Sequence, residues 1–242
     1  MPATGEFVVP ARFCGPPHSG NGGWVSGTAA AFVPTDDERP AVTVRLRTPP
    51  PLDRPLTVTT GDDGTARVTD GDHLVLEASS AARPAVDGIP AAVSFAVADA
   101  AGDRYEGLSD HPFPTCFTCG TQRGDDALGL RPGRLQDGDA YAAAWTPGAD
   151  VDVATVWAAL DCPGGWSAGF AGRPMVLGTM TAWVRQVPTP GEPHVVMAWP
   201  CGAQGRKFFS GTALYAADGE LLGRAEATWI AVDPAAIRPA AG

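Results

Sequence analysis

Residues 152–170 read Asp-Val-Ala-Thr-Val-Trp-Ala-Ala-Leu-Asp-Cys-Pro-Gly-Gly-Trp-Ser-Ala-Gly-Phe. Four apolar residues of this stretch are spaced i, i+3, i+4 and i+7, namely Val153, Val156, Trp157 and Leu160. That spacing marks one face of a helix and predicts a largely buried helix over the first ten residues. Asp161 stands where this helix is expected to end, before the Pro-Gly-Gly break. A carboxylate at that point is either a desolvated functional group or a surface residue at a helix terminus.

The chain on either side of this helix shows the same order of elements twice. In the first half, short strands at 6–9 and 12–14 and a glycine-rich loop precede a helix from Trp24 to Phe32, and strands are expected at 42–47, 56–60, 65–69 and 73–79. In the second half, strands are expected at 140–145 before the helix and at 176–187, 194–199, 207–216 and 220–232 after it. One helix covers only one face of such a sheet, so two units are expected to pair. The sequence therefore predicts an α+β protein with an N-terminal repeat at 1–100, a linker at 101–114 and a C-terminal repeat at 115–242.

Composition limits the classes of partner. The formal net charge of -10 argues against a general nucleic-acid or anionic-membrane role, because both depend on clustered Lys and Arg. No stretch approaches the roughly 20 apolar residues of a membrane span, and the first residues lack a basic start followed by an apolar run. We expect a soluble, cytoplasmic protein.

The chain has five cysteines, an odd number that does not suit a framework of disulfides. This favours a reducing compartment. Cys116 and Cys119 form a single Cys-x-x-Cys pair, which alone is weak evidence for zinc. Cys14, Cys162 and Cys201 are the residues that can complete such a site, but the sequence favours no metal. Cys162 next to Asp161 is interpreted as a buried small residue rather than a nucleophile, since no nearby histidine is evident.

Several motifs point to one family. Cys116-Phe117-Thr118-Cys119-Gly120 followed by Leu128-Gly129-Leu130-Arg131 resembles the Cys-Phe-x-Cys-Gly, Asn-Pro-x-Gly-Leu opening of thioesterase-superfamily hotdog proteins. The helix ending Ala-Ala-Leu-Asp161 resembles their signature of His-Gly-Gly, five variable residues and Leu-Asp. The closing segment, with Gly205-Arg206-Lys207, Tyr215 and Asp218-Gly219, is similar to their last strands. The resemblance implies a tandem, or double, hotdog protein like the acyl-CoA thioesterases, in which a long helix is wrapped by an antiparallel sheet in each repeat.

The resemblance also implies a mechanism. In that family a carboxylate on the helix activates water, and amides at a helix N-terminus polarise the thioester carbonyl; exposed N–H groups and the positive end of the dipole suit a developing oxyanion. Aligning Asp161 with the signature Asp places Asp152 where the family has His, so the second half lacks the glycines. Aligning Asn21-Gly22-Gly23 with His-Gly-Gly places Ala30 at the Asp position. We therefore expect one composite site, with the Gly22 and Gly23 amides and Asn21 or His18 facing Asp161. The equivalent site on the other side, with Ala30 and Val153, is expected to be inactive.

A competing register and several simpler interpretations stay open. Gly22-Gly23-Trp24 can instead match Gly164-Gly165-Trp166, and Asn21 can be no more than a helix N-cap. Three tryptophans are candidates to line the acyl pocket: Trp24, Trp157 and Trp166. Arg206 and Lys207 can bind the phosphates of coenzyme A or be ordinary surface charges.

Three functions follow from these residues. The first is hydrolysis of an acyl-CoA or acyl-carrier-protein thioester, with coenzyme A entering only as part of the substrate and no other cofactor. The second is hydration or dehydration of an acyl thioester, which usually needs an Asp and a His together. The third is a non-catalytic protein that binds a thioester or another small ligand. Because the two repeats pair within one chain, a monomer or a homodimer is expected.

Overall fold

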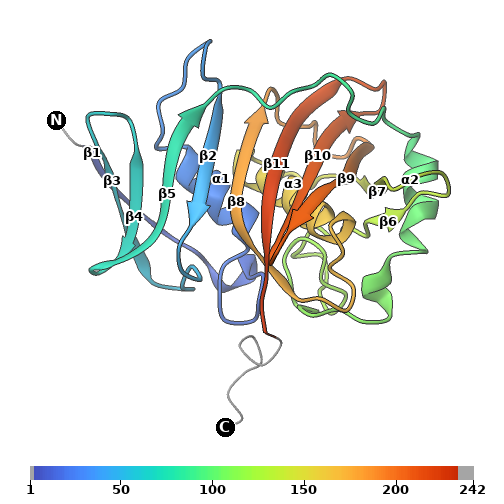
Figure 1. Cartoon of the computed structure of the whole chain (residues 1–242), viewed down its shortest axis with the longest axis horizontal. Coiled ribbons are helices and arrows are strands. Elements are labelled where there is room, and N and C mark those ends of the chain that lie inside the picture. The colour runs from blue at the N-terminus through green and yellow to red at the C-terminus, as the bar shows by residue number, and fades with distance from the viewer. Residues whose placement is uncertain (1–2, 234–242) are drawn as a thin grey trace, which may run out of the picture.

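The computed structural model describes residues 3–233 (Figure 1). Two long buried helices carry the pattern expected from the sequence, α1 at Gly22–Ala30 and α3 at Val153–Ser167. The remaining helices are α2 at Phe95–Gly102 and the 3-10 turns η1 at Ala11–Phe13 and η2 at Glu106–Leu108. Asn21 caps α1 and Asp152 caps α3, each accepting a hydrogen bond from a backbone N–H of the first turn.

Eleven strands form one continuous antiparallel sheet in the order β1-β3-β4-β5-β2-β8-β11-β10-β9-β7-β6. The first half of the chain supplies β1 Ala3–Val8, β2 Ala41–Leu46, β3 Pro55–Thr60, β4 Ala66–Asp70 and β5 His73–Ala81. The second half supplies β6 Gly133–Arg134, β7 Tyr141–Trp145, β8 Met175–Val184, β9 His194–Gln204, β10 Lys207–Ala216 and β11 Leu221–Ala231.

The two halves meet at β2 and β8 in the middle of the sheet. Val42 pairs with Ala182 and Val44 with Met180 across this seam, so the hydrogen-bonded ladder runs from one half into the other. The hydroxyls of Thr43 and Thr181 hydrogen-bond at 2.7 Å on the same seam. The sheet curls around α1 and α3, which lie side by side against it (Figure 1).

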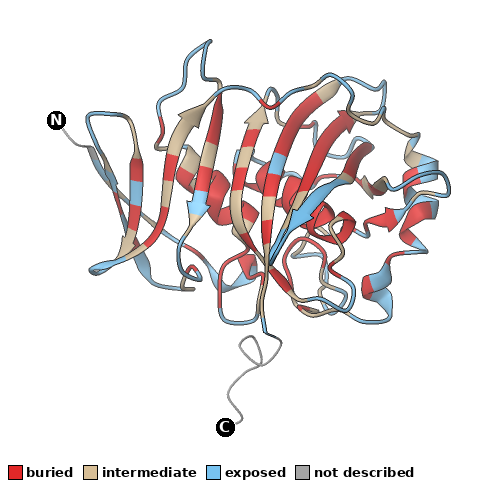
Figure 2. Cartoon of the chain, viewed as in Figure 1, coloured by how far each residue is buried: buried red, intermediate tan, exposed pale blue. Residues whose placement is uncertain are grey.

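The main core lies between the sheet and this helix pair. Red, buried segments run along both helices and along the strands that face them (Figure 2). A second, smaller apolar cluster lies where α2 packs against β7 and β9, with Ala98, Met197 and Tyr215 at its centre. Helix α2 therefore belongs to the second half and begins at Phe95, before the linker that the sequence predicted at 101–114.

Two local predictions were wrong. Residues 11–13 form a 3-10 turn rather than part of a strand. The helix expected to end at Asp161 continues through Pro163 to Ser167, so Asp161 lies inside α3. An internal proline costs a helix about 3 kcal/mol. Here the last turn stays helical because its residues are buried in the core, where Trp166 is fully enclosed.

Within residues 3–233, no helix is both long and apolar enough to cross a lipid bilayer.

Candidate active site

The N-terminus of α1 is the first component of the site. The Asn21 side-chain oxygen accepts a hydrogen bond from the Trp24 N–H at 2.9 Å, and the Asn21 carbonyl accepts from the Val25 N–H. The Gly23 N–H donates to Asp161 Oδ2 at 2.9 Å. Among the residues that the structure describes, the Gly22 N–H has no hydrogen-bond partner. One donor at the positive end of the helix dipole is therefore free, and Gly22 lines the cavity described below.

Asp161 is the second component and comes from the middle of α3. Only 2% of this residue is exposed, and its Oδ1 atom has no hydrogen-bond partner within the described chain. Burial raises the pKa of Asp161 to about 8, while the hydrogen bond from the Gly23 N–H and the nearby Asn21 side chain act in the opposite direction. The carboxyl group therefore holds a proton far more tightly than an exposed aspartate does.

Asp161 and Gly22 line one cavity of about 440 Å³. It is lined by the loop before α1, including His18, and by the segment after β2, including Arg47 and Pro50. Its inner wall is apolar and is contributed by Phe113, Phe170, Met175, Leu177, Trp229 and Ile230. A few polar groups thus face a largely apolar surface, which is typical of a small-molecule site.

The Cys-Phe-Thr-Cys-Gly loop closes the back of the site. The Asn21 side-chain amide donates to Thr118 Oγ1 at 3.3 Å, and Thr118 Oγ1 donates to the Ala158 carbonyl at 3.1 Å. One buried threonine therefore connects the cap of α1 to the backbone of α3. These contacts hold the cap in position beside Asp161.

Close contact between α1 and α3 brings the two components together. A Cβ built on Gly23 would lie 2.9 Å from the Cα of Ala158, and one built on Gly27 would lie 2.7 Å from the Cα of Ala154. The helices therefore run antiparallel and approach as closely as their backbones allow. Only residues without a side chain permit this distance.

These contacts agree with the correspondence between the two halves that the sequence motifs indicate. Gly23 contacts Ala158, and Gly27 contacts Ala154. If α1 is superposed on α3 so that one contact falls on the other, Gly23 is equivalent to Ala154. The same register places Ala30 at the position equivalent to Asp161. The alternative register is wrong, because Gly22-Gly23 lie in the first turn of α1 whereas Gly164-Gly165 lie in the last turns of α3.

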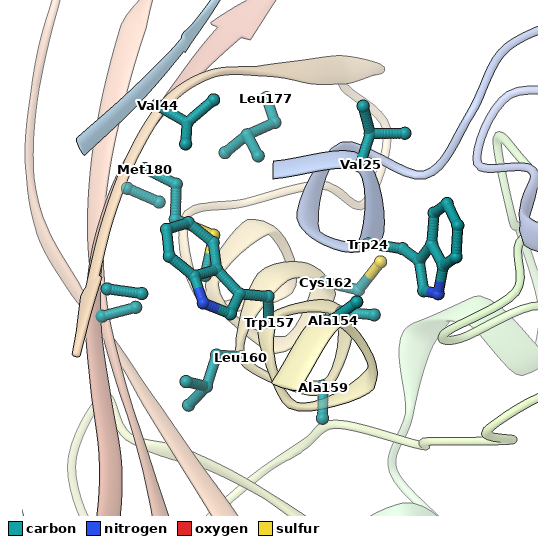
Figure 3. Close-up of a cluster of buried hydrophobic side chains, with 14 of the residues drawn as sticks. Trp24, Val25, Val44, Ala154, Trp157, Ala159, Leu160, Cys162, Leu177 and Met180 are labelled. Atoms are coloured by element: carbon teal, nitrogen blue, oxygen red, sulfur yellow. The ribbon is translucent and has the colours of Figure 1, made fainter. Parts of the chain in front are cut away.

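The three tryptophan candidates do not line the cavity. Trp24 stacks on Phe13 with ring centroids 4.0 Å apart. Trp157 points toward Met180 on the sheet side of α3, away from Trp24 (Figure 3). Trp166 packs against Phe170, which does line the cavity, so it supports the wall from behind.

The remaining candidates lie at or near the cavity. His18 is exposed and lines the cavity. Arg206 lies in the turn between β9 and β10, Lys207 is the first residue of β10, and both are exposed. Lys207 pairs with Ile230, a residue of the cavity wall, so both basic residues lie one strand away from the cavity.

Sequence reasoning missed the aromatic wall. Phe113 and Phe170 meet edge to face at 5.8 Å, and Phe170 and Trp229 do so at 5.7 Å. These three residues come from a loop, the segment after α3 and the last strand. No local spacing relates them, so no signal in the sequence indicates that they share one wall.

Comparison with solved structures agrees with this architecture. A conserved protein of unknown function with a hot dog fold from Alicyclobacillus acidocaldarius matches with a TM-score of 0.60 at 15% identity, over 96% of this chain and 94% of that chain. Acyl-CoA thioesterase II TesB2 from Mycobacterium marinum matches with a TM-score of 0.55 at 12% identity, over 91% and 92%. The dehydratase domain of PpsC from Mycobacterium tuberculosis, in complex with C12:1-CoA, matches with a TM-score of 0.57 at 15% identity, over 96% and 94%.

No protein-family model and no curated protein sequence matches the chain. The similarity is therefore one of fold and spans almost the whole chain. It confirms the prediction of an α+β double hotdog fold, in which two repeats share one sheet.

Proposed function

We propose that this protein hydrolyses an acyl thioester at one composite site between its two repeats. The observation that carries the proposal is the meeting of Asp161 with the N-terminus of α1 at a single cavity, where Gly23 holds the carboxylate and the Gly22 N–H is free. Thioesterase and dehydratase structures of the same fold, one with a bound acyl-CoA, support a thioester as the substrate class.

Each group has a distinct role in this reaction. The Gly22 N–H donates to the thioester carbonyl oxygen and stabilises the negative charge that develops there. Asp161 accepts a proton from water as the water oxygen bonds to the carbonyl carbon, and the carbon–sulfur bond then breaks. The proton returns to the leaving sulfur, so the products are a carboxylic acid and a free thiol. Attack by Asp161 itself, followed by hydrolysis of the anhydride, gives the same products.

The environment of Asp161 suits a general base. A carboxylate with an ordinary pKa is a weak base at neutral pH, whereas burial raises the pKa of Asp161 to about 8. The Gly23 N–H fixes Oδ2 and leaves Oδ1 without a protein partner. We assign Oδ1, the buried oxygen without a protein partner, as the one that accepts the proton from water.

The rest of the cavity suits the acyl group and the carrier. The apolar wall accommodates an acyl chain or ring. Lys207 is the cross-strand partner of Ile230 in that wall, so we assign Lys207 and the adjacent Arg206 to the phosphates of a coenzyme A carrier. Among the described residues that line the cavity, Asp161 is the one acidic residue, and Arg47 is a basic one whose guanidinium pairs with Glu77.

The test is release of free thiol from a panel of short, long and aromatic acyl-CoAs by wild type and by Asp161→Asn. The substitution keeps size and removes the base, so we expect kcat/KM to fall by about 100-fold or more, within the range for a catalytic base. Asp99→Asn, on exposed α2, is the matched control and should leave the rate unchanged. Turnover by folded Asp161→Asn at the wild-type rate would overturn the proposal, and thioester binding without thiol release in wild type would favour the non-catalytic function.

A second candidate is hydration or dehydration of an acyl thioester. It is favoured by one observation: His18 and Asp161 line the same cavity. The measurement is loss of enoyl-CoA absorbance without release of thiol, compared between wild type and His18→Gln. Water addition that depends on His18 would replace hydrolysis as the function of this site.

A further inference from the structure

Three cysteines from distant parts of the chain meet in the core. The Sγ atoms of Cys116, Cys119 and Cys162 all lie within 4.8 Å of one another. Cys116 and Cys119 come from the loop before β6, and Cys162 comes from α3. All three are buried and none is in a disulfide.

The spacing is close to that of sulfur atoms around one metal ion. A metal–sulfur distance of about 2.3 Å in a tetrahedral site separates the sulfurs by about 3.8 Å. The Sγ atoms of Cys116 and Cys162 are 3.6 Å apart, so these two need almost no movement. Cys119 completes the set with a shift of no more than about 1 Å.

The loop is built as a tight turn around this position. Gly120 N–H donates to the Cys116 carbonyl at 2.9 Å, and a Cβ at Gly120 would lie 2.5 Å from that carbonyl oxygen. Only glycine fits there, which explains the Cys-x-x-Cys-Gly sequence in steric terms. The turn directs both of its sulfurs toward α3.

Polar donors surround the sulfurs. The Trp166 indole N–H donates to Cys119 Sγ at 3.4 Å. The Asn21 side-chain amide lies 3.7 Å from Cys116 Sγ and 3.8 Å from Cys162 Sγ. N–H groups around sulfur stabilise the negative charge of metal-bound thiolates and orient the ligands.

We propose that Cys116, Cys119 and Cys162 bind one soft, thiophilic metal ion, Zn(II) or Cu(I). Three sulfurs with no imidazole or carboxylate among them suit such ions rather than Mg(II) or Ca(II). On binding, three S–H bonds are exchanged for three metal–sulfur bonds and the thiol protons are released to solvent. The ion would join the loop to α3 one residue from Asp161. The argument for this ion does not rest on the proposed hydrolysis, although the metal site adjoins the hydrolytic one through Asn21 and α3. It departs from the expectation of no metal drawn from the single Cys-x-x-Cys pair.

The first experiment measures metal content. Wild type is expressed in medium supplemented with zinc and, separately, with copper, is purified under reducing conditions, and its metals are counted by mass spectrometry. We expect about one Zn(II) or Cu(I) per chain, and the two media distinguish the ions. Cys162→Ala and Cys119→Ala should lose it. The matched controls are Cys14→Ala, which is also buried, and Cys201→Ala, which is exposed; both should retain it.

The second experiment uses only the wild-type protein, so its result does not depend on whether a variant folds. Anaerobic titration of wild type with Co(II) should produce thiolate-to-cobalt charge-transfer absorption that saturates at one equivalent and is displaced by Zn(II). Wild type that retains no metal from either medium and shows no such absorption would overturn the proposal. Equal metal content in wild type and in folded Cys162→Ala would overturn it as well.

Discussion

Asp161 and Gly23 form the contact on which the proposed chemistry depends. A buried carboxylate is costly unless it is hydrogen-bonded, and here a single backbone N–H at a helix N-terminus partners one oxygen. The other oxygen is left without a protein partner inside the described chain. Such an incompletely satisfied buried group is expected at a functional site rather than in a purely structural core.

Gly23→Ala tests the close approach of the two helices. Alanine favours a helix over glycine by about 1 kcal/mol. The new Cβ, however, would lie 2.6 Å from the Trp157 carbonyl oxygen and 2.5 Å from the Cβ of Asp161, which forces the helices apart. We expect the clash to dominate and the free energy of unfolding to fall by about 1–3 kcal/mol, measured by chemical denaturation.

The matched control for this prediction is Gly124→Ala. Gly124 is exposed, and a Cβ there meets nothing within 4 Å, so its effect should stay within about 0.5 kcal/mol. A folded Gly23→Ala protein with wild-type stability would show that α1 and α3 can separate freely.

At the scale of the element, α3 does more than present one residue. Its middle carries Asp161, the next residue is a member of the cysteine cluster, and its last turn supports the aromatic wall through Trp166. The Leu160 carbonyl accepts a hydrogen bond from Thr212 Oγ1 at 2.8 Å, so a strand hydroxyl fixes the helix just before Pro163. The continuation of α3 past its proline is therefore what gathers these groups in one region.

Phe170→Leu tests the cavity wall where α3, β8 and β11 meet. Under the proposed hydrolysis, the smaller side chain leaves room for a longer acyl group. Each additional buried CH₂ is worth about 0.8 kcal/mol, so kcat/KM for the longer acyl-CoA should rise roughly four-fold relative to the shorter one.

Phe32→Leu is the control, because Phe32 packs against Phe7 and is outside the cavity. The measurement is the acyl-length profile of thiol release for both variants. An unchanged profile in Phe170→Leu would place the acyl group elsewhere.

For the whole molecule, the seam between the halves decides whether each half is stable. The edge strands β2 and β8 of the two halves hydrogen-bond to each other, and α1 buries one face against α3. The first half alone would expose both the edge of β2 and that helix face. Pairing the two repeats removes both surfaces from water.

Cutting the chain at Gly88, in the loop after β5, should give two fragments that fold only together. Residues 1–88 alone are expected to be unfolded or aggregated, and mixing with residues 89–242 should restore native circular dichroism and a single species of full-length size. Size-exclusion chromatography and circular dichroism measure this. A folded 1–88 fragment, whether monomer or dimer, would contradict the seam argument.

The sequence by itself determined most of the elements and their order, but not α2 or β6. Helical spacing around Trp157, alternating strands and turn signals are local patterns, and the structure confirms α1, α3 and most strands to within a few residues. The motifs around Cys116 and Leu160-Asp161 were specific enough to indicate a double hotdog fold. Local pattern failed at Pro163, because burial in the core outweighed the proline.

Only the tertiary structure decided which groups meet. The hydrogen bond from Gly23 to Asp161 joins residues 138 positions apart, and Cys116 and Cys162 are 46 apart. The Phe113–Phe170–Trp229 wall likewise combines three separate segments. Spacing along the chain carries no information about such contacts, because they depend on how two helices cross and on how the sheet curls around them. The elements follow from local preference, whereas the site follows from packing.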